Sequence, residues 1–272
     1  MDLKIVSWNV NSIRARIDSL TDLLTIERPD IIGLQETKVI DEEFPMKLFH
    51  DFGYEIIFFG QKTYNGVAIA LKKNSQITVK NVIKNIPDFK DEQARCLTLR
   101  ILINETIELN FINVYIPNGS AFDSPKFDYK LSFINALLNH SQSLLRTTEH
   151  LLVMGDFNIA PTDIDVHDPK AWEGKILCSK TERNKFSEFL DLGLVDSFRH
   201  TCPHSSEYSW WDYRQGSFRR NAGLRIDHIL GSEEFIKTCV GAGIYKDIRK
   251  HQKPSDHAPV WAKLNFSNLL KG

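Results

Sequence analysis

The chain has 272 residues, of which 42% are hydrophobic and 25% charged. This composition is typical of a folded globular protein and excludes a chain that stays disordered. The formal net charge is only −1, so a polyanionic partner would need a local basic surface. The four cysteines lack the spacing of a zinc or thiol redox motif. No apolar run nears the ~20 residues of a membrane helix and no signal peptide precedes the first strand, so we expect a cytoplasmic protein without membrane contact.

The beginning of the chain shows a strand, helix, strand pattern. Residues 3–10 are apolar and rich in Ile and Val, which predicts a central strand with Asn9 at its end. Apolar residues at helical spacing then predict an amphipathic helix that starts at Ser12. Residues 30–36 predict a second buried strand, which ends at Glu36. Both strands therefore end in a polar side chain.

A run of β-rich segments separated by turn residues predicts antiparallel strands that complete a first sheet. These segments cover residues 54–59, 66–72, 77–86, 96–103 and 107–115. The last one ends at Tyr115, and Pro117 and Asn118 follow it. A helix is then predicted over residues 129–145.

The apolar run at residues 151–155 predicts a buried strand with Asp156 at its tip. Asn158 lies two residues further on, and on an extended chain the two side chains would point to the same side. Residues 160–180 carry little periodicity and predict a long loop. A helix is predicted over residues 181–192.

The last third of the chain combines aromatic, basic and apolar segments. They are the aromatic cluster at 208–213, a basic loop at 215–223, a strand at 224–230 that includes Asp227, and a final strand at 259–264 just after Asp256 and His257.

Both chain halves repeat a strand and helix alternation. We expect an α/β (α+β) four-layer sandwich, in which two packed mixed β-sheets are flanked by helices, formed as a single domain over residues 1–272. The active site is expected at one edge of the sheets.

The polar residues at these strand ends match the chemistry of phosphodiester hydrolysis. That reaction needs a nucleophilic water, stabilisation of negative charge on the phosphoryl group and neutralisation of the leaving oxygen. Glu36 is a hard oxygen ligand suited to Mg²⁺ or Mn²⁺. Asp227 is expected to accept a hydrogen bond from His257 and fix its tautomer, and Asp156 is the candidate acid or base. Tyr115 would donate a hydrogen bond to a phosphoryl oxygen.

Each residue alone also has an ordinary interpretation. A strand-end Asp is most often a turn residue, a single histidine is most often structural, and Trp210 by itself suits a core. Their coincidence at the ends of predicted strands favours a site. Asn9 and Asn158 would then orient the water or the phosphate through neutral hydrogen bonds.

Six segments and one aromatic stretch resemble the exonuclease III family of apurinic/apyrimidinic endonucleases, within the endonuclease/exonuclease/phosphatase superfamily. They are Trp8-Asn9-Val10-Asn11 with Arg14-Ala15, Leu34-Gln35-Glu36-Thr37-Lys38, Val114-Tyr115-Ile116-Pro117-Asn118, Gly155-Asp156-Phe157-Asn158, Leu224-Arg225-Ile226-Asp227, Ser255-Asp256-His257 and the stretch from Tyr208 to Arg214. The match covers nearly the whole chain in the family's order.

The resemblance implies roles for individual residues. The implied catalytic residues are Asp156, His257, Tyr115, Asn158 and Asp227. The implied metal site binds Mg²⁺, with Mn²⁺ able to substitute, and its candidate ligands are Glu36, Asn9, Asp227, Asp256, Asp156, Asn158 and His257. The implied DNA-binding residues are Asn118, Trp210, Arg14, Leu224 and Arg225, where Trp210 would line a pocket for a flipped abasic sugar and Leu224 replaces an aromatic residue of some relatives.

The implied reaction is hydrolysis of the DNA backbone 5′ to abasic sites, with 3′-to-5′ exonuclease and 3′-phosphatase activity as companions. The implied partner is double-stranded DNA with abasic or blocked 3′ ends, bound by a monomer in the cytoplasm, or at the nucleoid if the source is bacterial.

One alternative is a phosphatase of inositol phosphates or lipids, against which the aromatic cluster at 208–213 argues. The other is a non-catalytic nucleic-acid-binding module, which would be expected to lack at least one of these carboxylates.

Overall fold

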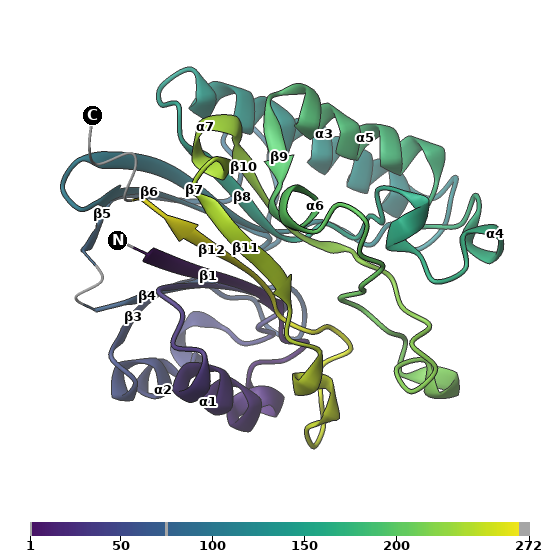
Figure 1. The fold of residues 1–272 in the computed structure, drawn as a ribbon, viewed down its shortest axis with the longest axis horizontal. Helices are drawn as coiled ribbons and strands as arrows, with labels where there is room; N and C mark the ends of the chain where they lie inside the picture. Colours follow the sequence, from purple (N-terminus) through teal and green to yellow (C-terminus); the bar gives the residue numbers. More distant parts are fainter. Residues whose placement is uncertain (1, 74–75, 267–272) are drawn as a thin grey trace.

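Two β-sheets pack face to face in the computed structural model, which describes residues 2–73 and 76–266 (Figure 1). The first sheet has the strand order β11 (Cys239–Ile244), β12 (Val260–Asn265), β1 (Asp2–Asn9), β2 (Ile31–Gln35), β4 (Val67–Lys72) and β3 (Tyr54–Phe59). The second sheet has the order β5 (Ile77–Lys84), β6 (Cys96–Ile103), β7 (Ile107–Tyr115), β8 (Leu151–Asp156), β10 (Asp227–Ser232) and β9 (Leu194–Asp196). Both sheets are mixed, because β1 runs parallel to β2 and β7 runs parallel to β8 while the other pairings are antiparallel.

Helices cover the outer faces of the two sheets. The helices α1 (Ile17–Ile26) and α2 (Met46–Asp51) lie on the first sheet, and α3 (Pro125–Leu145) and α5 (Lys180–Asp191) lie on the second (Figure 1). Shorter elements connect them: α4 (Pro169–Trp172), α6 (Ser197–Thr201), α7 (Glu233–Ile236) and the 3-10 turns Arg14–Arg16, Asp41–Glu43, Asp163–Asp165, Arg214–Gly216 and Lys246–Lys250. The predicted four-layer sandwich is confirmed. None of the helices within the described ranges has the length and apolar character needed to cross a membrane.

Strand alternation explains both the core and the position of the polar residues. On β1, Leu3 and Ile5 pack between the sheets, whereas Val6 and Trp8 face the layer of α1. Asn9 continues the series of Leu3 and Ile5, so its side chain points between the sheets at their edge. The same alternation on β8 puts Asp156 on the side of the core residues Leu152 and Met154. The active-site edge is therefore the continuation of the inter-sheet core into polar residues.

A glycine allows β8 to approach β7 closely just before Asp156. Gly155 has a φ of 147°, and a Cβ atom there would lie 1.8 Å from the carbonyl oxygen of Val114. Neither the backbone conformation nor the space would accept a side chain. Gly155 thus fixes the geometry of the strand tip.

Several predicted boundaries were wrong. The first helix does not begin at Ser12, which has a φ of 87°; a 3-10 turn precedes α1 instead. The predicted long loop at 160–180 contains α4 and a capped 3-10 turn. The sequence patterns also missed α2 and β11, because the former is short and the latter contains two glycines that interrupt the apolar signal.

Candidate active site

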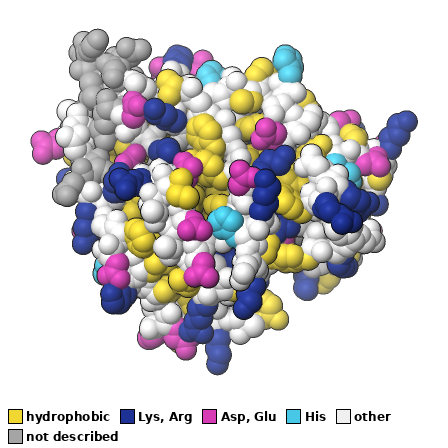
Figure 2. Space-filling view, turned by 60° about the horizontal axis from the view of Figure 1, so that its bottom comes forward, with side chains coloured by type: hydrophobic (Ala, Val, Ile, Leu, Met, Phe, Trp, Pro, Cys, Tyr) yellow, Lys and Arg dark blue, Asp and Glu magenta, His cyan; other side chains and the backbone are white. Residues whose placement is uncertain are grey.

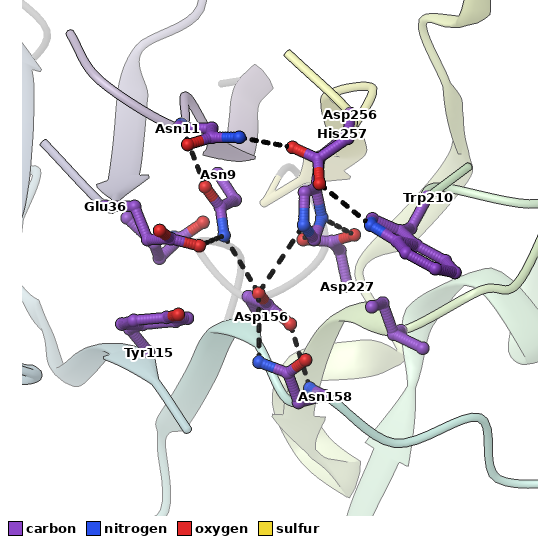
Figure 3. Close-up of polar contacts among 12 residues, drawn as sticks. Asn9, Asn11, Glu36, Tyr115, Asp156, Asn158, Trp210, Asp227, Asp256 and His257 are labelled. Atoms are coloured by element: carbon purple, nitrogen blue, oxygen red, sulfur yellow. Dashed lines mark hydrogen bonds and ion pairs between the residues drawn. The ribbon is translucent and has the colours of Figure 1, made fainter. Parts of the chain in front are cut away.

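Three strands bring Asp156 between Tyr115 and Asp227. Asp156 is the register partner of Tyr115 on the parallel strand β7 and of Asp227 on the antiparallel strand β10. Their side chains therefore share one side of the second sheet. Across the gap between the sheets, Asn9 donates from its amide nitrogen to Asp156 at 2.9 Å and to Glu36 at 2.8 Å (Figure 3). One amide group thus links two carboxylates from different sheets.

Asn158 meets Asp156 through a turn rather than through an extended strand. β8 ends at Asp156, and Asn158 has a left-handed backbone with a φ of 50°. Its backbone N–H donates to one carboxylate oxygen of Asp156 at 2.8 Å, and its side-chain amide donates to the other at 3.2 Å and to the carbonyl of Ile116 at 2.9 Å. Asn118 donates to the side-chain oxygen of Asn158 at 3.1 Å. The prediction of an extended chain through Asn158 was wrong, but the two side chains do meet.

His257 is oriented by Asp227, as the sequence predicted. The imidazole Nδ1 lies 2.9 Å from a carboxylate oxygen of Asp227, and that oxygen also accepts a hydrogen bond of 2.6 Å from Ser209. The other ring nitrogen, Nε2, lies 3.7 Å from Asp156 (Figure 3). The hydrogen bond to Asp227 thus directs Nε2 towards the centre of the site.

The charges of this buried group are strongly coupled. Burial opposes a positive charge on His257, but the surrounding carboxylates, Asp227 first among them, outweigh it and raise the pKa of the imidazole. Burial raises the pKa of Asp156, against the attraction of His257. A protonated imidazole between two carboxylates compensates for placing Asp156 opposite Asp227, since like charges in register destabilise a strand pair.

Asp256 faces away from this group and closes the other side of the site. Its two oxygens accept hydrogen bonds from Asn11 at 2.8 Å and from the indole N–H of Trp210 at 3.0 Å (Figure 3). The preceding residue, Ser255, donates to the backbone carbonyl of Asn9 at 2.7 Å. The loop that carries Asp256 and His257 is therefore tied directly to the end of β1.

Tyr115 lines a cavity beside the carboxylates. The cavity has a volume of about 440 Å³ and is also lined by Glu36, Asn118 and Arg95. Burial, together with the negative charges of Glu36 and Asp156, raises the pKa of the Tyr115 hydroxyl well above its ordinary value. The hydroxyl therefore stays protonated and can donate a hydrogen bond to an anionic oxygen in the cavity.

The donor set fits a divalent cation. Asp156, Asp227 and the deprotonated form of His257 can each offer a ligand atom, and these atoms lie within 4.8 Å of one another among the described residues. Glu36 stands apart from this group on the far side of Asn9, where its second oxygen pairs with Lys38 at 2.9 Å. Two carboxylates and one imidazole form a donor set that could hold a divalent metal ion. A cation bound here would neutralise negative charge on a phosphoryl oxygen.

Some predicted DNA-binding residues lie elsewhere than expected. Arg225 is 1% exposed, and its guanidinium pairs with Asp165 and Asp196, each at 2.7 Å. Its assignment as a DNA-binding residue was therefore wrong, since the side chain cannot reach a ligand at the surface. Leu224 is also fully buried; its backbone pairs with that of Trp210, and its side chain belongs to the same apolar cluster. Arg14 is exposed and forms an ion pair with Glu43.

Several polar residues that position the site had no predicted role. Ser209, Asn11 and Ser255 all bond directly to a candidate catalytic or metal-binding residue or to its loop. All three lie inside the segments that resemble the exonuclease III family, so proximity to those segments was the available signal. Their partners come from distant segments, which spacing along the chain does not reveal.

The fold and the site define a phosphodiester hydrolase with a candidate divalent-metal centre. A family model described as the Endonuclease/Exonuclease/phosphatase family matches residues 6–257, and the chain belongs to this family. Within it, the enzyme is of the exonuclease III and AP endonuclease type, as the following relatives indicate. The resemblance noted from the motifs is confirmed.

The chain is 37% identical over 269 residues to exodeoxyribonuclease III of Haemophilus influenzae, covering 96% of this chain and 99% of that protein. Among solved structures, the 3′ phosphatase NExo from Neisseria bound to product DNA hairpin has a TM-score of 0.91 and 39% identity, over 97% of this chain and 99% of that one. An AP endonuclease from Archaeoglobus fulgidus has a TM-score of 0.89 and 34% identity, over 97% and 99% of the two chains. These similarities extend over the whole two-sheet fold.

Proposed function

We propose that this protein is an AP endonuclease of base excision repair, which hydrolyses the DNA backbone 5′ to an abasic site in the presence of Mg²⁺ or Mn²⁺. The observation that carries the proposal is the arrangement of Asp227, His257 and Asp156 in one line of contacts beside Trp210. An oriented imidazole next to a buried carboxylate is suited to proton transfer and to contact with a phosphate. The AP endonuclease from Archaeoglobus fulgidus adds support.

The residues take roles that follow from their contacts. Asp156 orients the attacking water and handles its proton, because its oxygens face the centre of the site. His257 and the hydroxyl of Tyr115 donate to phosphoryl oxygens, and Asn158 with Asn118 binds the phosphate through neutral hydrogen bonds. A divalent cation supplies charge neutralisation at the phosphate when bound.

The lesion would contact an apolar surface that includes Trp210. That indole is half-buried, contacts Trp172 edge to face with ring centres 6.4 Å apart, and lies against half-buried Ile176 and buried Leu224. A sugar without a base is small enough for such a surface and loses little stacking when it leaves the duplex. Double-stranded DNA is thus the proposed partner, bound by a monomer.

The charge pattern of the surface agrees with limited, local contacts to DNA. On the face shown in Figure 2, basic and acidic side chains are interspersed and hydrophobic side chains are exposed among them. A formal net charge of −1 gives no general attraction to a polyanion. Affinity would therefore depend on a few Lys and Arg side chains, of which exposed Arg14 is one candidate.

A second candidate is removal of blocked 3′ ends, as a 3′ phosphatase or a 3′-to-5′ exonuclease. The observation in its favour is the 39–40% identity to Neisseria structures described as a 3′ phosphatase and as a 3′-5′ exonuclease. The chemistry at phosphorus is the same for both candidates, because the scissile phosphate needs the same water, charge neutralisation and leaving group. The candidates differ in what would contact the apolar surface around Trp210.

The test compares three labelled duplexes: one with a single tetrahydrofuran abasic analogue, one with a 3′-phosphate at a nick, and one intact. Each is incubated with Mg²⁺, with Mn²⁺ or with EDTA, using an Asp156→Asn variant as the control for contaminating nucleases. Metal-dependent incision immediately 5′ of the analogue, faster than loss of the 3′-phosphate, supports the AP endonuclease. Removal of the 3′-phosphate without incision at the analogue would replace it with the second candidate.

A further inference from the structure

A lysine completely enclosed behind the site contacts the two segments that carry Asn118 and Asn158. Lys130 lies on α3 and is 0% exposed. Its ammonium donates to the backbone carbonyl of Asn158 at 2.8 Å, to the backbone carbonyl of Asn118 at 3.3 Å and to the carboxylate of Glu182 at 2.5 Å. An ammonium has three donors, so these acceptors use all of its capacity.

The two carbonyls belong to the connections that leave β7 and β8. Asn118 follows β7 and Asn158 follows β8, and neither connection continues its strand. The backbone of Asn158 is held in the left-handed region, which non-glycine residues enter only when their surroundings impose it. The ammonium of Lys130 donates to both carbonyls and thereby fixes the relative positions of these two loops.

Glu182, the ion-pair partner of Lys130, is itself held in place by several hydrogen bonds. It is also 0% exposed, and it forms a capping box with Ser179 at the start of α5. The carboxylate oxygen that pairs with Lys130 accepts a further hydrogen bond of 3.0 Å from the backbone of Leu177. Both partners are thus fixed in place by bonds beyond the ion pair itself.

A contribution to folding stability does not by itself explain why Lys130 and Glu182 form a buried ion pair. Two charges lose their hydration when they are buried, and well-packed apolar residues of similar volume often give an equal or more stable fold. The positions of the acceptors of Lys130 point instead to a role in the candidate site. Two of the three are main-chain carbonyls of residues whose side-chain amides touch each other at 3.1 Å at the edge of the active site.

We infer that Lys130 is a positioning residue, which sets the side-chain amides of Asn118 and Asn158 in the geometry that receives the scissile phosphate. This inference rests on the proposed function for the role of the two amides, and on the contacts above for the role of the lysine. Lys130 does not touch the substrate. It acts through the two carbonyls, and Glu182 supplies the countercharge that allows an ammonium to stay in this enclosed position.

The first test replaces Lys130 with methionine, which keeps the length of the side chain and removes the donors. Steady-state kinetics on the best substrate of the unmodified protein should show kcat lowered by about 10–100-fold, the usual effect of removing a group that orients a contact residue, with KM changed by less than about twofold. The matched control is Leu137→Ala on the same helix, which creates a buried cavity about 10 Å further along the helix and removes no hydrogen-bond donor. At a temperature well below both melting points, Leu137→Ala should keep the kcat of the unmodified protein.

A second variant keeps the inference testable if the single change destabilises the fold. In Lys130→Met/Glu182→Gln the buried charge is removed from both partners while residue 182 keeps an oxygen that can accept a hydrogen bond from Leu177 or Ser179, so the melting temperature should recover towards that of the unmodified protein. The value of kcat should stay low, because the carbonyls of Asn118 and Asn158 still lack their donor. Recovery of kcat together with the melting temperature would overturn the positioning role. If the unmodified protein cleaves no phosphodiester at all, the proposed function is wrong. If the unmodified protein is active and both Lys130 variants keep its kcat, only the positioning role of Lys130 is wrong.

Discussion

Asn9 and Asp156 lie on different sheets, and a hydrogen bond of 2.9 Å joins them at the edge where the sheets meet. The same amide nitrogen of Asn9 also donates to Glu36, so two carboxylates share one neutral donor. This contact bridges the two sheets at the site. The orientation of the two carboxylates therefore depends on an uncharged side chain between them.

Replacement of Asn9 should consequently disturb both carboxylates at once. We expect Asn9→Ala to lower kcat by about 10–100-fold, because both Glu36 and Asp156 lose the donor that orients them. Asn11→Ala is the comparison, since Asn11 bonds to Asp256 on the other side of the site. Steady-state rates of both variants with saturating metal would test this, and an Asn9→Ala enzyme with unchanged kcat would contradict it.

The proton-handling group should be essential for rate but not for binding. We expect Asp156→Asn and His257→Ala each to reduce kcat by roughly 10²–10⁴-fold, the usual contribution of a general acid or base. Affinity for an uncleaved duplex, measured by fluorescence anisotropy in EDTA, should change little. Near-normal turnover in either variant would rule out the assigned role.

Glu36 is expected to affect the metal requirement. Glu36→Gln keeps the size of the side chain and removes its charge, so the Mg²⁺ concentration for half-maximal activity should rise by about tenfold or more. Lys38 pairs with the same carboxylate, and Lys38→Met serves as a comparison with the opposite change in local charge. Identical Mg²⁺ titrations for Glu36→Gln and the unmodified protein would remove Glu36 from the list of ligands.

Trp210 combines an apolar wall with a hydrogen bond to Asp256, and two variants separate these contributions. Trp210→Phe keeps an aromatic wall and loses a hydrogen bond to a charged group, with an expected cost of about 1.5–3 kcal/mol in folding stability. Trp210→Ala also removes the aromatic wall and should reduce discrimination between an abasic analogue and an intact nucleotide. This discrimination is measured as kcat/KM on the abasic duplex divided by kcat/KM on the intact duplex. Equal values for Trp210→Phe and Trp210→Ala would argue against Trp210 as an apolar wall.

The buried charges around Arg225 should make stability depend on pH. Burial opposes a negative charge on Asp196, but Arg225 and His228 outweigh it and hold the pKa of this carboxyl below its usual range. A carboxyl with a lowered folded-state pKa stabilises the fold above its ordinary pKa of ~3.9, and this stabilisation is lost as the pH falls below that value. Asp196→Asn should cost about 3–5 kcal/mol at pH 7, and the difference from the unmodified protein should shrink between pH 4 and pH 2.

Denaturant unfolding across this pH range tests the prediction. Asp123→Asn, at an exposed loop position, should leave the pH dependence unchanged. A gap between Asp196→Asn and the unmodified protein that stays constant down to pH 2 would show that Asp196 does not contribute through its charge.

Much of the fold and of the candidate site could be predicted from the sequence, because alternation in β-strands directly encodes which residues face the core. Asn9 and Asp156 end their strands and Asp227 begins the antiparallel neighbour of β8, so their convergence follows from the sandwich itself. The left-handed turn at Asn158 could not be predicted, since its local sequence is compatible with an extended strand. The burial of Arg225 could not be predicted either, because its partners Asp165 and Asp196 lie far away in the chain.

The contacts between the end of β1 and the loop before β12 join the two most distant parts of the candidate site along the chain. The indole N–H of Trp8 donates to the carbonyl of His257, 249 positions later, and β12 pairs with β1 along its length. Without residues 255–265, β1 would have a free edge and the imidazole would be missing from the site. The first sheet and the candidate site are therefore completed by the same segment, so neither can form fully without the other.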